Sequence, residues 1–557
     1  MLRTLLILVG LPIASMLAFL AFRAAEPRVD FVVHSDELRT IDPQKVSFLD
    51  EIQVANAIFE GLTRLNPATM LPEPGCAERW TISPDGTRYE FKLRDGLRWT
   101  NGDPLVAEDF RAAWLRALDP ALGAQYSPFL FLVAGGEAYY QARRSGSAGD
   151  ASKVGLRAPD DHTFVVTLAA PCPYFLDLTS FPTLVPLHRP TIERFAYRDG
   201  RVLERSFEWT RPENMVSNGA FTLERWDFKR RLVLKRNPTY WDHSAIHVER
   251  IEIAIMSPKA ALLAYETGGV DLVRGLEPDD ARVMRAEAAA GRRSDFHTGP
   301  RLATFFLRVN CTKPPLDDAR VRQALSLAID RAAICESVLG VGETPAYSFV
   351  PPAMSKLVGY QPPAGLGAVE ENGTIVAEPR DERIRRARAL LETAGYDATR
   401  PLRLAYTSDP PQQRFILQAV AAMWERDLGI RVELEVTERK VLSERIRALD
   451  YDIARSDWFG DYLDPSTFLD LFVAGSSQNR TGWSHAEYTA LIRATASEPD
   501  AAARFATLRE AETILVRDEL PIIPIYFRTG NYLLRPRFAG LSDNLRDILP
   551  IHRVLPE

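Results

Sequence analysis

The sequence contains few residues that form cross-links or metal centres. Four of the 557 residues are cysteines, namely Cys76, Cys172, Cys311 and Cys335, and no two of them have the spacing of metal ligands. A cysteine-based metal site is therefore excluded. Four cysteines allow three complete disulfide pairings, and the sequence does not choose among them. We expect small buried side chains with at most one disulfide.

Short catalytic motifs are also absent. The chain has no G-x-x-x-x-G-K-[ST] phosphate loop, no G-x-S-x-G nucleophile turn and no H-E-x-x-H zinc helix. His243 and His247 have ligand spacing, but Pro238 precedes them and a strand-like run follows, so we expect ordinary surface histidines. The sequence predicts a protein that is not an enzyme and that carries no metal or cofactor.

Neither sign of charge is in marked excess. The 68 lysines and arginines are scattered among 74 acidic residues, and the net charge is −6. A nucleic-acid-binding surface would need clustered basic residues, so we expect no nucleic acid partner. Hydrophobic residues make up 46% of the chain and charged residues 25%, which is typical of a folded globular protein.

Only one long apolar run is present, and it lies at the N-terminus. Residues Thr4 to Phe22 carry no charge and follow Arg3. This pattern predicts that residues 1–26 are either a secretory signal peptide or an uncleaved membrane anchor. No A-x-A pair sits cleanly before Glu26, and both interpretations stay open. We expect the chain after about Pro27 to be one soluble body in the periplasm, on the far side of the cytoplasmic membrane.

The length of 557 residues predicts two or three domains, because one hydrophobic core stops growing near 250 to 300 residues. Up to about Leu187 the sequence favours antiparallel strands, as in "RYEFKLRDGLRWTNGDP", with turns at Asp95-Gly96 and Asn101-Gly102. Further short strands are predicted in "GAFTLERW", "RRLVLKRN" and "VERIEIAI".

After about Arg301 the pattern changes to helices that alternate with short strands, which is typical of an α/β lobe. Apolar residues at three- and four-residue spacing predict one amphipathic helix through "PPLDDARVRQALSLAIDRAAICESVL". Other helices are expected at 107–118, 381–394 and 412–428. A strand-like run from Pro521 returns toward the first lobe, so we predict two lobes joined by two crossings.

One stretch combines opposite charges with large aromatic rings. "ARSDWFGDYLDP" begins in a predicted strand and continues past its end into a loop. Ligands of open α/β sheets gather at the carboxyl ends of strands, and unpaired acids are not tolerated in a core. We therefore interpret this stretch as part of a binding site.

Several stretches together resemble the oligopeptide-binding proteins of bacterial ABC importers, the extracytoplasmic solute-binding proteins of the peptide and nickel class (family 5). The resemblance extends along almost the whole chain after the N-terminal run and includes "AIFEGLTRL", "FKLRDGLRWTNGDPLVAEDF", "SNGAFTLERW", "LKRNPTYWD" and "VNCTKPPLDDARVRQALSLAIDR". It implies a two-lobed α/β periplasmic-binding-protein fold, type II-like and cluster C. An extra sheet-rich subdomain is expected at about 60–190, within a first lobe of residues 27–302. The second lobe is expected at 303–520, with a C-terminal return at 521–557.

The resemblance also implies how a peptide would bind. It would lie extended between the lobes, paired like an added strand. Asp461 would take its ammonium group and Arg455 the carboxylate of a tripeptide, whereas Lys313 would receive the carboxylate of a longer peptide. Tyr126 matches a tyrosine near the ammonium end, and Trp458 matches a tryptophan beside the binding strand. Alternatively, Asp461 and Arg455 form an internal ion pair, and Trp458 simply packs.

This sequence departs from the family pattern at several positions. Two bridging cysteines of the family appear as Ala303 and Phe459, and a glutamate near the ammonium site appears as Ser47. A ring of one pocket appears as Arg439 and a small residue as Asp457, so the pocket is expected to be more charged.

The resemblance therefore implies a monomer that binds a short peptide and delivers it to an ABC transporter permease. Two alternatives stay open. One is another solute, such as a cell-wall peptide, a nickel chelate or a sugar, and the other is a membrane-tethered peptide sensor or chaperone.

Overall fold

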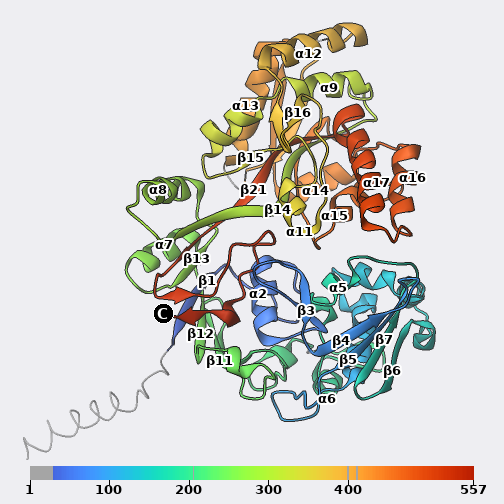
Figure 1. Ribbon diagram of the computed structural model, residues 1–557, viewed down its shortest axis with the longest axis vertical. Coiled ribbons are helices and arrows are strands. Elements are labelled where there is room, and N and C mark those ends of the chain that lie inside the picture. The colour runs from blue at the N-terminus through green and yellow to red at the C-terminus, as the bar shows by residue number, and fades with distance from the viewer. Residues whose placement is uncertain (1–28, 205, 398–399, 409–411) are drawn as a thin grey trace, which may run out of the picture.

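The computed structural model describes residues 29–204, 206–397, 400–408 and 412–557. The chain forms two lobes, one above the other in Figure 1. The first half of the chain and the C-terminus lie in the lower lobe (lobe I), and the yellow and orange segments lie in the upper lobe (lobe II). The expected signal peptide or anchor at 1–26 lies outside the described residues. None of the helices in the described ranges is long and apolar enough to cross a membrane.

One sheet of eleven strands runs through both lobes, in the order β10-β11-β12-β1-β13-β21-β14-β20-β18-β19, with β15 against β21. β1 is parallel to β12 and β13, and β18 is parallel to β19 and β20, as in the α/β class. In lobe I the strands are β1 (Phe31–Ser35), β10 (Phe221–Asp227), β11 (Arg231–Arg236), β12 (Arg250–Ile255) and β13 (Leu272–Arg274). In lobe II they are β15 (Thr344–Pro345), β18 (Leu402–Thr407), β19 (Val432–Thr437) and β20 (Ile453–Phe459).

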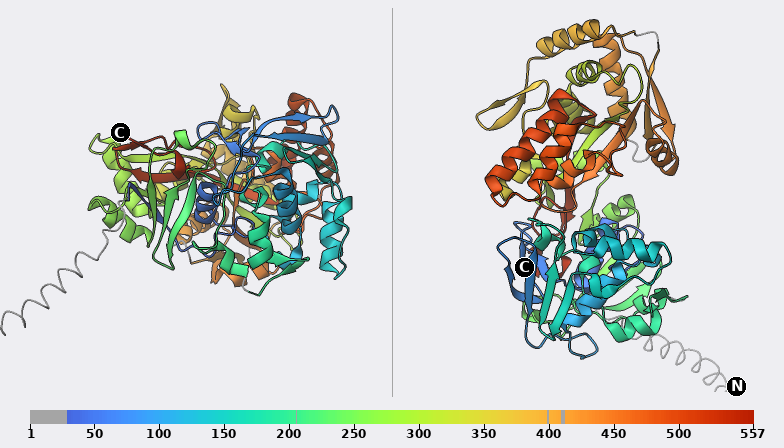
Figure 2. Two further views of the ribbon diagram at one scale, coloured as in Figure 1. Left: turned by 90° about the horizontal axis from the view of Figure 1, so that it is seen from below. Right: turned by 90° about the vertical axis from the view of Figure 1, so that its right-hand side faces the viewer.

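Two long antiparallel strands, β14 (Phe296–Val309) and β21 (Ile522–Leu534), join the lobes (Figure 2). Their pairing shifts register between Pro300 and Thr304, where Arg528 alone faces three residues of β14. A bulge of this kind bends a strand pair and interrupts its hydrogen bonds. The expected lobe boundary at 302 therefore falls within β14, and the boundary at 520 falls just before β21.

A second sheet, in the order β4-β5-β7-β6, builds the outer part of lobe I. Tyr89 and Phe91 are buried on one face of β5, and Gly96 and Gly102 have φ of +73° and +92°, as the predicted turns require. The strands are β4 (Ala77–Ile82), β5 (Arg88–Leu93), β6 (Leu156–Asp160) and β7 (Thr163–Thr167). The helices of lobe I are α2 (Leu49–Ile58), α3 (Ala107–Ala117), α4 (Gly136–Arg144), α5 (Phe175–Leu178), α6 (Arg189–Phe195), α7 (Pro258–Glu266) and α8 (Pro278–Ala289).

Helices cover the sheet of lobe II and enclose a core around Trp424 and Ile453. The predicted helices that end before Gly395 and Gly429 are confirmed, and both glycines adopt positive φ. The helices are α9 (Ala319–Leu327), α10 (Arg331–Ala333), α11 (Ser355–Val358), α12 (Arg380–Ala394), α13 (Gln412–Leu428), α14 (Arg439–Arg447), α15 (Ser466–Leu469), α16 (Ala486–Thr495) and α17 (Ala501–Thr513).

One helix prediction was wrong. The single amphipathic helix expected from Asp318 onward is divided, because α9 ends at Leu327 and Asp330 starts α10. The Asp330 carboxylate accepts a hydrogen bond from the Ala333 backbone N–H at 3.1 Å. An aspartate that satisfies free N–H groups begins a helix, and apolar periodicity does not reveal this.

All four cysteines are free thiols, and Cys76, Cys172 and Cys335 are buried. Small two-stranded ribbons complete the fold: β2 (Thr63–Leu65) with β3 (Pro72–Pro74), β8 (Tyr197–Arg198) with β9 (Arg201–Val202), β16 (Ala368–Glu371) with β17 (Thr374–Ala377), and β22 (Phe538–Ala539) with β23 (Leu555–Pro556).

Candidate functional site

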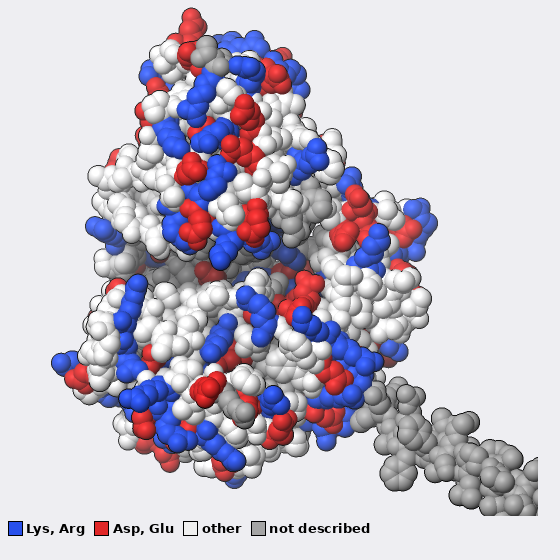
Figure 3. Space-filling view, turned by 180° about the vertical axis from the view of Figure 1, so that it is seen from behind, with Lys and Arg blue, Asp and Glu red and all other residues white. Residues whose placement is uncertain are grey.

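A cleft lies between the two lobes, next to the crossing strands (Figure 3). Its volume is about 1250 Å³, which is large enough for a short peptide or a molecule of similar size. Both lobes and the C-terminal segment contribute to its wall. The lining residues are Asp36, Glu37, Arg39, Ser47, Phe48, Leu49, Asp50, Glu51, Ile52, Tyr126, Phe181, Arg301, Leu302, Arg439, Phe459, Gly460, Asp461, Leu545, Arg546, Asp547 and Ile548.

The segment interpreted as a site from the sequence enters this cleft where β20 ends. Phe459 is the last residue of β20, and Gly460 and Asp461 follow it into the loop. The chain passes very close to β14 here, since a Cβ atom on Gly460 would lie 2.6 Å from the Leu302 side chain. A side chain at position 460 would therefore force Leu302 or the loop to shift.

Asp461 presents a carboxylate to the cleft. Among the described residues its side chain has no hydrogen bond or salt bridge, although its backbone N–H donates to Thr467 Oγ1 at 3.0 Å. Burial raises the pKa of Asp461 to about 6, and the nearby Arg546 only partly offsets this. Such a group gains free energy from a cation that enters the cleft.

Tyr126 reaches the same cleft from lobe I. Its ring packs edge-on against Phe181, with 4.5 Å between ring centroids. Burial raises the pKa of the Tyr126 hydroxyl to about 12, and the negative charge of Asp461 adds to this. The structure therefore brings together Tyr126 and Asp461, which are 335 positions apart in the sequence.

Arg455 and Asp457 form a different arrangement from either one expected. Asp457 accepts hydrogen bonds from Arg528 Nε at 2.8 Å and from Arg455 Nη2. Arg455 and Asp457 both lie on β20, which pairs with β14, and neither lines the cleft. The alternative ion pair between Arg455 and Asp461 is not formed, because Arg455 pairs with Asp457 instead.

Trp458 and Phe459 lie on opposite faces of β20. Trp458 packs against the lobe II core that contains Leu302 and Phe306, so its position fits the packing alternative. Phe459 is 50% exposed and lines the cleft. It pairs with Ala303 across β14 and β20, so the two positions where the family has cysteines are direct neighbours.

Arg439 and Lys313 differ in their relation to the cleft. Arg439 is the first residue of α14 and lines the cleft from lobe II. β14 ends at Val309, seven residues beyond the cleft-lining Leu302, and Lys313 follows that end of the strand. At about 3.3 Å per residue this places the end of the strand roughly 23 Å away. Lys313 is not among the lining residues.

Several cleft residues were not identified from the sequence. Arg301 forms an ion pair with Asp547, and Asp547 also accepts a hydrogen bond from Arg274 at 3.0 Å. Arg546 comes from the same C-terminal segment. No local motif marks these residues, and the return of the chain after β21 brings Arg546 and Asp547 to the cleft.

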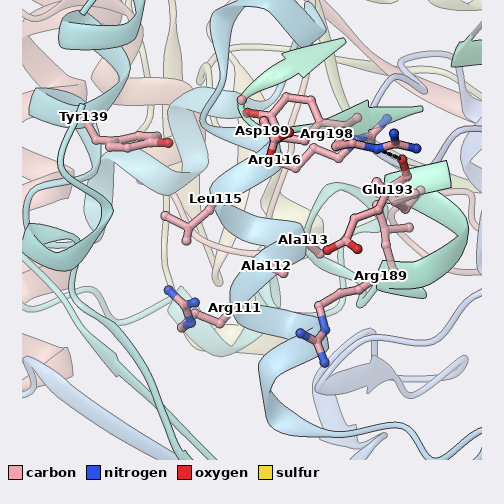
Figure 4. A pocket seen from close by; sticks show the side chains of 14 residues that line it. Arg111, Ala112, Ala113, Leu115, Arg116, Tyr139, Arg189, Glu193, Arg198 and Asp199 are labelled. Atoms are coloured by element: carbon pink, nitrogen blue, oxygen red, sulfur yellow. Dashed lines mark hydrogen bonds between the residues drawn. The ribbon is translucent and has the colours of Figure 1, made fainter. Parts of the chain in front are cut away.

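A second, smaller cavity of about 260 Å³ lies on lobe I between α3 and α6 (Figure 4). Its arginines are already engaged. Arg111 pairs with Glu108 at 2.6 Å, Arg189 with Asp109 at 3.0 Å, and Arg198 donates to the Glu193 carbonyl at 2.8 Å. We interpret this cavity as structural. His243 and His247 belong to no metal-binding cluster within the described part of the chain.

Comparison with known proteins identifies the family. Residues 72–480 match the model of the bacterial extracellular solute-binding proteins, family 5. The chain belongs to this family. Family 5 membership agrees with the resemblance found in the sequence and with the two-lobed α/β fold.

Relatives match over nearly the whole chain. The probable deoxycholate-binding periplasmic protein YgiS of Escherichia coli is 34% identical, over 91% of this chain and 89% of its own length. The periplasmic oligopeptide-binding protein OppA of E. coli is 30% identical over the same shares. Among solved structures, a complex of Haemophilus influenzae OppA with RPPGFSPFR superposes with a TM-score of 0.74 and 29% identity, covering 95% of this chain and all of that one.

Proposed function

We propose that this family 5 protein captures short peptides in the interlobe cleft and delivers them to the permease of an ABC transporter, without catalysing a reaction. The observation that carries the proposal is the Asp461 carboxylate, which faces the cleft without an ion-pair partner among the described residues. A peptide ammonium group supplies the missing cation.

Electrostatics favour a ligand with a free amino terminus. Asp461 lies in a site of reduced polarity, where an ion pair is stronger than in water. Tyr126 and Phe459 supply aromatic walls on either side of the cleft. The oligopeptide-binding relatives support this ligand class.

The opposite end of the peptide needs a cation. We propose Arg439, which lines the cleft from lobe II, as the group that faces the carboxylate or an acidic side chain. Arg455 takes this role only if its ion pair with Asp457 opens. Lys313 is displaced from the cleft, so we do not assign it to a peptide of the shortest length.

A carboxylate ligand without an amino group fits this cleft poorly. Deoxycholate, which YgiS is described as binding, is such an anion. It would leave the Asp461 carboxylate unpaired and would add a second negative charge nearby. We therefore favour a peptide over a bile acid.

The cellular setting is also part of the proposal. The relatives described as periplasmic support a position outside the cytoplasmic membrane. We propose that the protein acts there as a monomer, and that residues 1–26 direct its export or keep it at the membrane.

Native mass spectrometry of the purified protein tests the ligand class. Co-purified peptides of two to five residues, released on mild denaturation, are expected. The Asp461→Ala variant should lose them, whereas the fully exposed Asp381→Ala should keep them. A sugar, a metal chelate or a bile acid in place of peptides would contradict the proposal.

A further inference from the structure

The loop that carries Asp461 belongs to lobe II but is held by lobe I. The Leu463 backbone N–H donates to Asp177 Oδ2 on α5 at 2.8 Å. Arg546 Nη2 donates to the Asp461 backbone carbonyl at 2.7 Å. Two backbone groups of the loop are therefore fixed by side chains from outside lobe II.

Aromatic packing reinforces the same contact. Tyr462 stacks on Tyr174, with 3.9 Å between ring centroids and 7° between ring planes, and is buried in the core of lobe I. At the other end of the loop, Asp464 binds Arg504 of α17 through two hydrogen bonds of 2.7 and 2.8 Å. The loop thus bridges the lobes at a place separate from the crossing strands.

Arg546 is the positive charge that acts most directly on Asp461. It lowers the pKa of the Asp461 carboxyl against the larger effect of burial, yet it forms no ion pair with that carboxylate. Its Nη1 binds Asp177 Oδ1, and both side chains are buried, with exposed fractions of 5% and 7%. The guanidinium near Asp461 is therefore paired with Asp177.

We propose that Asp177 is a positioning residue for ligand binding: it engages Arg546 and the Leu463 N–H, which fixes the Asp461 loop against lobe I and keeps the guanidinium away from the Asp461 carboxylate. This inference rests on the proposed function, since it explains how the ammonium-binding group stays unpaired in the empty protein. Asp177 itself does not line the cleft.

Removing the charge of Asp177 should redirect Arg546. An unpaired buried guanidinium is strongly unfavourable, and Asp461 is a carboxylate within its electrostatic reach. In Asp177→Asn the Arg546 side chain is expected to turn to Asp461 and form an ion pair. An incoming ammonium group must then break that pair, which weakens binding by roughly tenfold if the pair contributes as much as one charged hydrogen bond.

The first measurement needs no ligand. The protein is labelled with ¹³C at the aspartate carboxyl, the Asp461 signal is assigned by its loss in Asp461→Asn, and its pKa is measured by NMR titration. The pKa should fall in Asp177→Asn because Arg546 now pairs with Asp461. It should rise in Asp177→Asn/Arg546→Gln, since the cation that lowers it is gone. An unchanged pKa in the single variant overturns the proposal.

Two comparisons separate positioning from a general loss of structure. Asp464→Asn removes a buried aspartate of the loop that pairs with Arg504, and it leaves the pair of Arg546 with Asp177 intact. The Asp461 pKa should therefore stay at the wild-type value. In an Arg546→Gln background, adding Asp177→Asn should change neither the pKa nor ligand affinity. This second comparison also decides the question if Asp177→Asn alone does not fold. A further pKa change in that background contradicts an action through Arg546.

The second measurement uses trialanine, with N-acetyltrialanine as its control, in titration calorimetry at pH 7.5. Asp177→Asn should weaken trialanine binding by about tenfold, and the double variant should recover most of it. If the wild-type protein does not bind trialanine and no peptides co-purify with it, the proposed function fails. The NMR result still decides the role of Asp177. Equal affinities of wild type and Asp177→Asn for trialanine would overturn the inference alone.

Discussion

At the scale of single residues, the Asp461 carboxylate is both a binding group and a source of instability. Its pKa is raised to about 6 by burial, so the folded protein binds this proton more tightly than the unfolded chain does. The charged form therefore lowers the stability of the empty protein. A ligand cation removes this unfavourable term, which couples binding to stability.

We predict that Asp461→Asn stabilises the ligand-free protein at pH 8 by on the order of 2 kcal/mol. The wild-type carboxylate is neutral below the unfolded pKa near 3.8 and fully charged above the folded pKa of about 6, so stability is lost as the pH rises between these values. Urea unfolding at pH 8 and pH 4 should show a difference only at pH 8. Equal stabilities at pH 8 would contradict the burial of an unpaired charge.

Gly460 sets the path of the same loop by its lack of a side chain. A Cβ atom there would meet Leu302 at 2.6 Å and Thr467 at 3.0 Å. Gly460→Ala is expected to destabilise the protein by about 1 to 3 kcal/mol and to weaken peptide binding, because the loop must shift. Gly269→Ala is the matched control, since its nearest contact would be 3.5 Å. Thermal unfolding that is equal for the two variants would show that the loop yields easily.

At the scale of secondary-structure elements, most helices and strands follow from local patterns. Gly395 and Gly429 end the helices that precede them, and alternating apolar residues mark β5 and β18. The exception is α10, where Asp330 starts a new helix inside a continuous apolar repeat. A local hydrogen bond decided this boundary, and the periodicity of the sequence did not reveal it.

Asp330→Ala should therefore destabilise lobe II by about 1 kcal/mol, the usual effect of losing an N-cap. Asp381→Ala, at an exposed first-turn position of α12, should have a much smaller effect. Chemical denaturation measures both. A neutral result for Asp330→Ala would mean that the tertiary packing of α9 and α10 alone fixes the break.

At the scale of the whole molecule, charges from distant segments meet where the lobes join. Asp547 in the C-terminal segment pairs with Arg301 on β14 and with Arg274 at the end of β13, next to the register shift of the crossing strands. The C-terminal return is thus attached to the junction of the lobes. Arg274 also pairs with Asp50 at 3.2 Å, whereas Asp547 is the carboxylate that pairs with Arg301.

We predict that Asp547→Asn lowers the free energy of unfolding by about 2 to 3 kcal/mol, because Arg301 loses its ion pair in a buried site. The control is Glu444→Gln, whose partner Arg447 is 58% exposed, and its effect should be below about 0.5 kcal/mol. Urea unfolding compares the two. Similar small effects in both variants would show that water already screens the Asp547 site.

The sequence alone determined the class of the fold, the position of most elements and the importance of the segment around Asp461. These features depend on residues close together in the chain: apolar periodicity, capping residues, and the local crowding of charge and aromatic rings. The family resemblance, confirmed by comparison, rests on the same local runs. It also directed attention to Tyr126, which the fold places beside Asp461.

Only the tertiary structure decided which of these groups meet. Arg455 pairs with Asp457 rather than Asp461, Lys313 lies beyond the far end of β14, and Arg546 reaches the Asp461 loop from the C-terminal segment. Several ion pairs at the cleft, such as that of Asp177 with Arg546, join residues hundreds of positions apart, and their energies depend on distance and burial in the folded chain. Neither quantity is contained in the local order of amino acids.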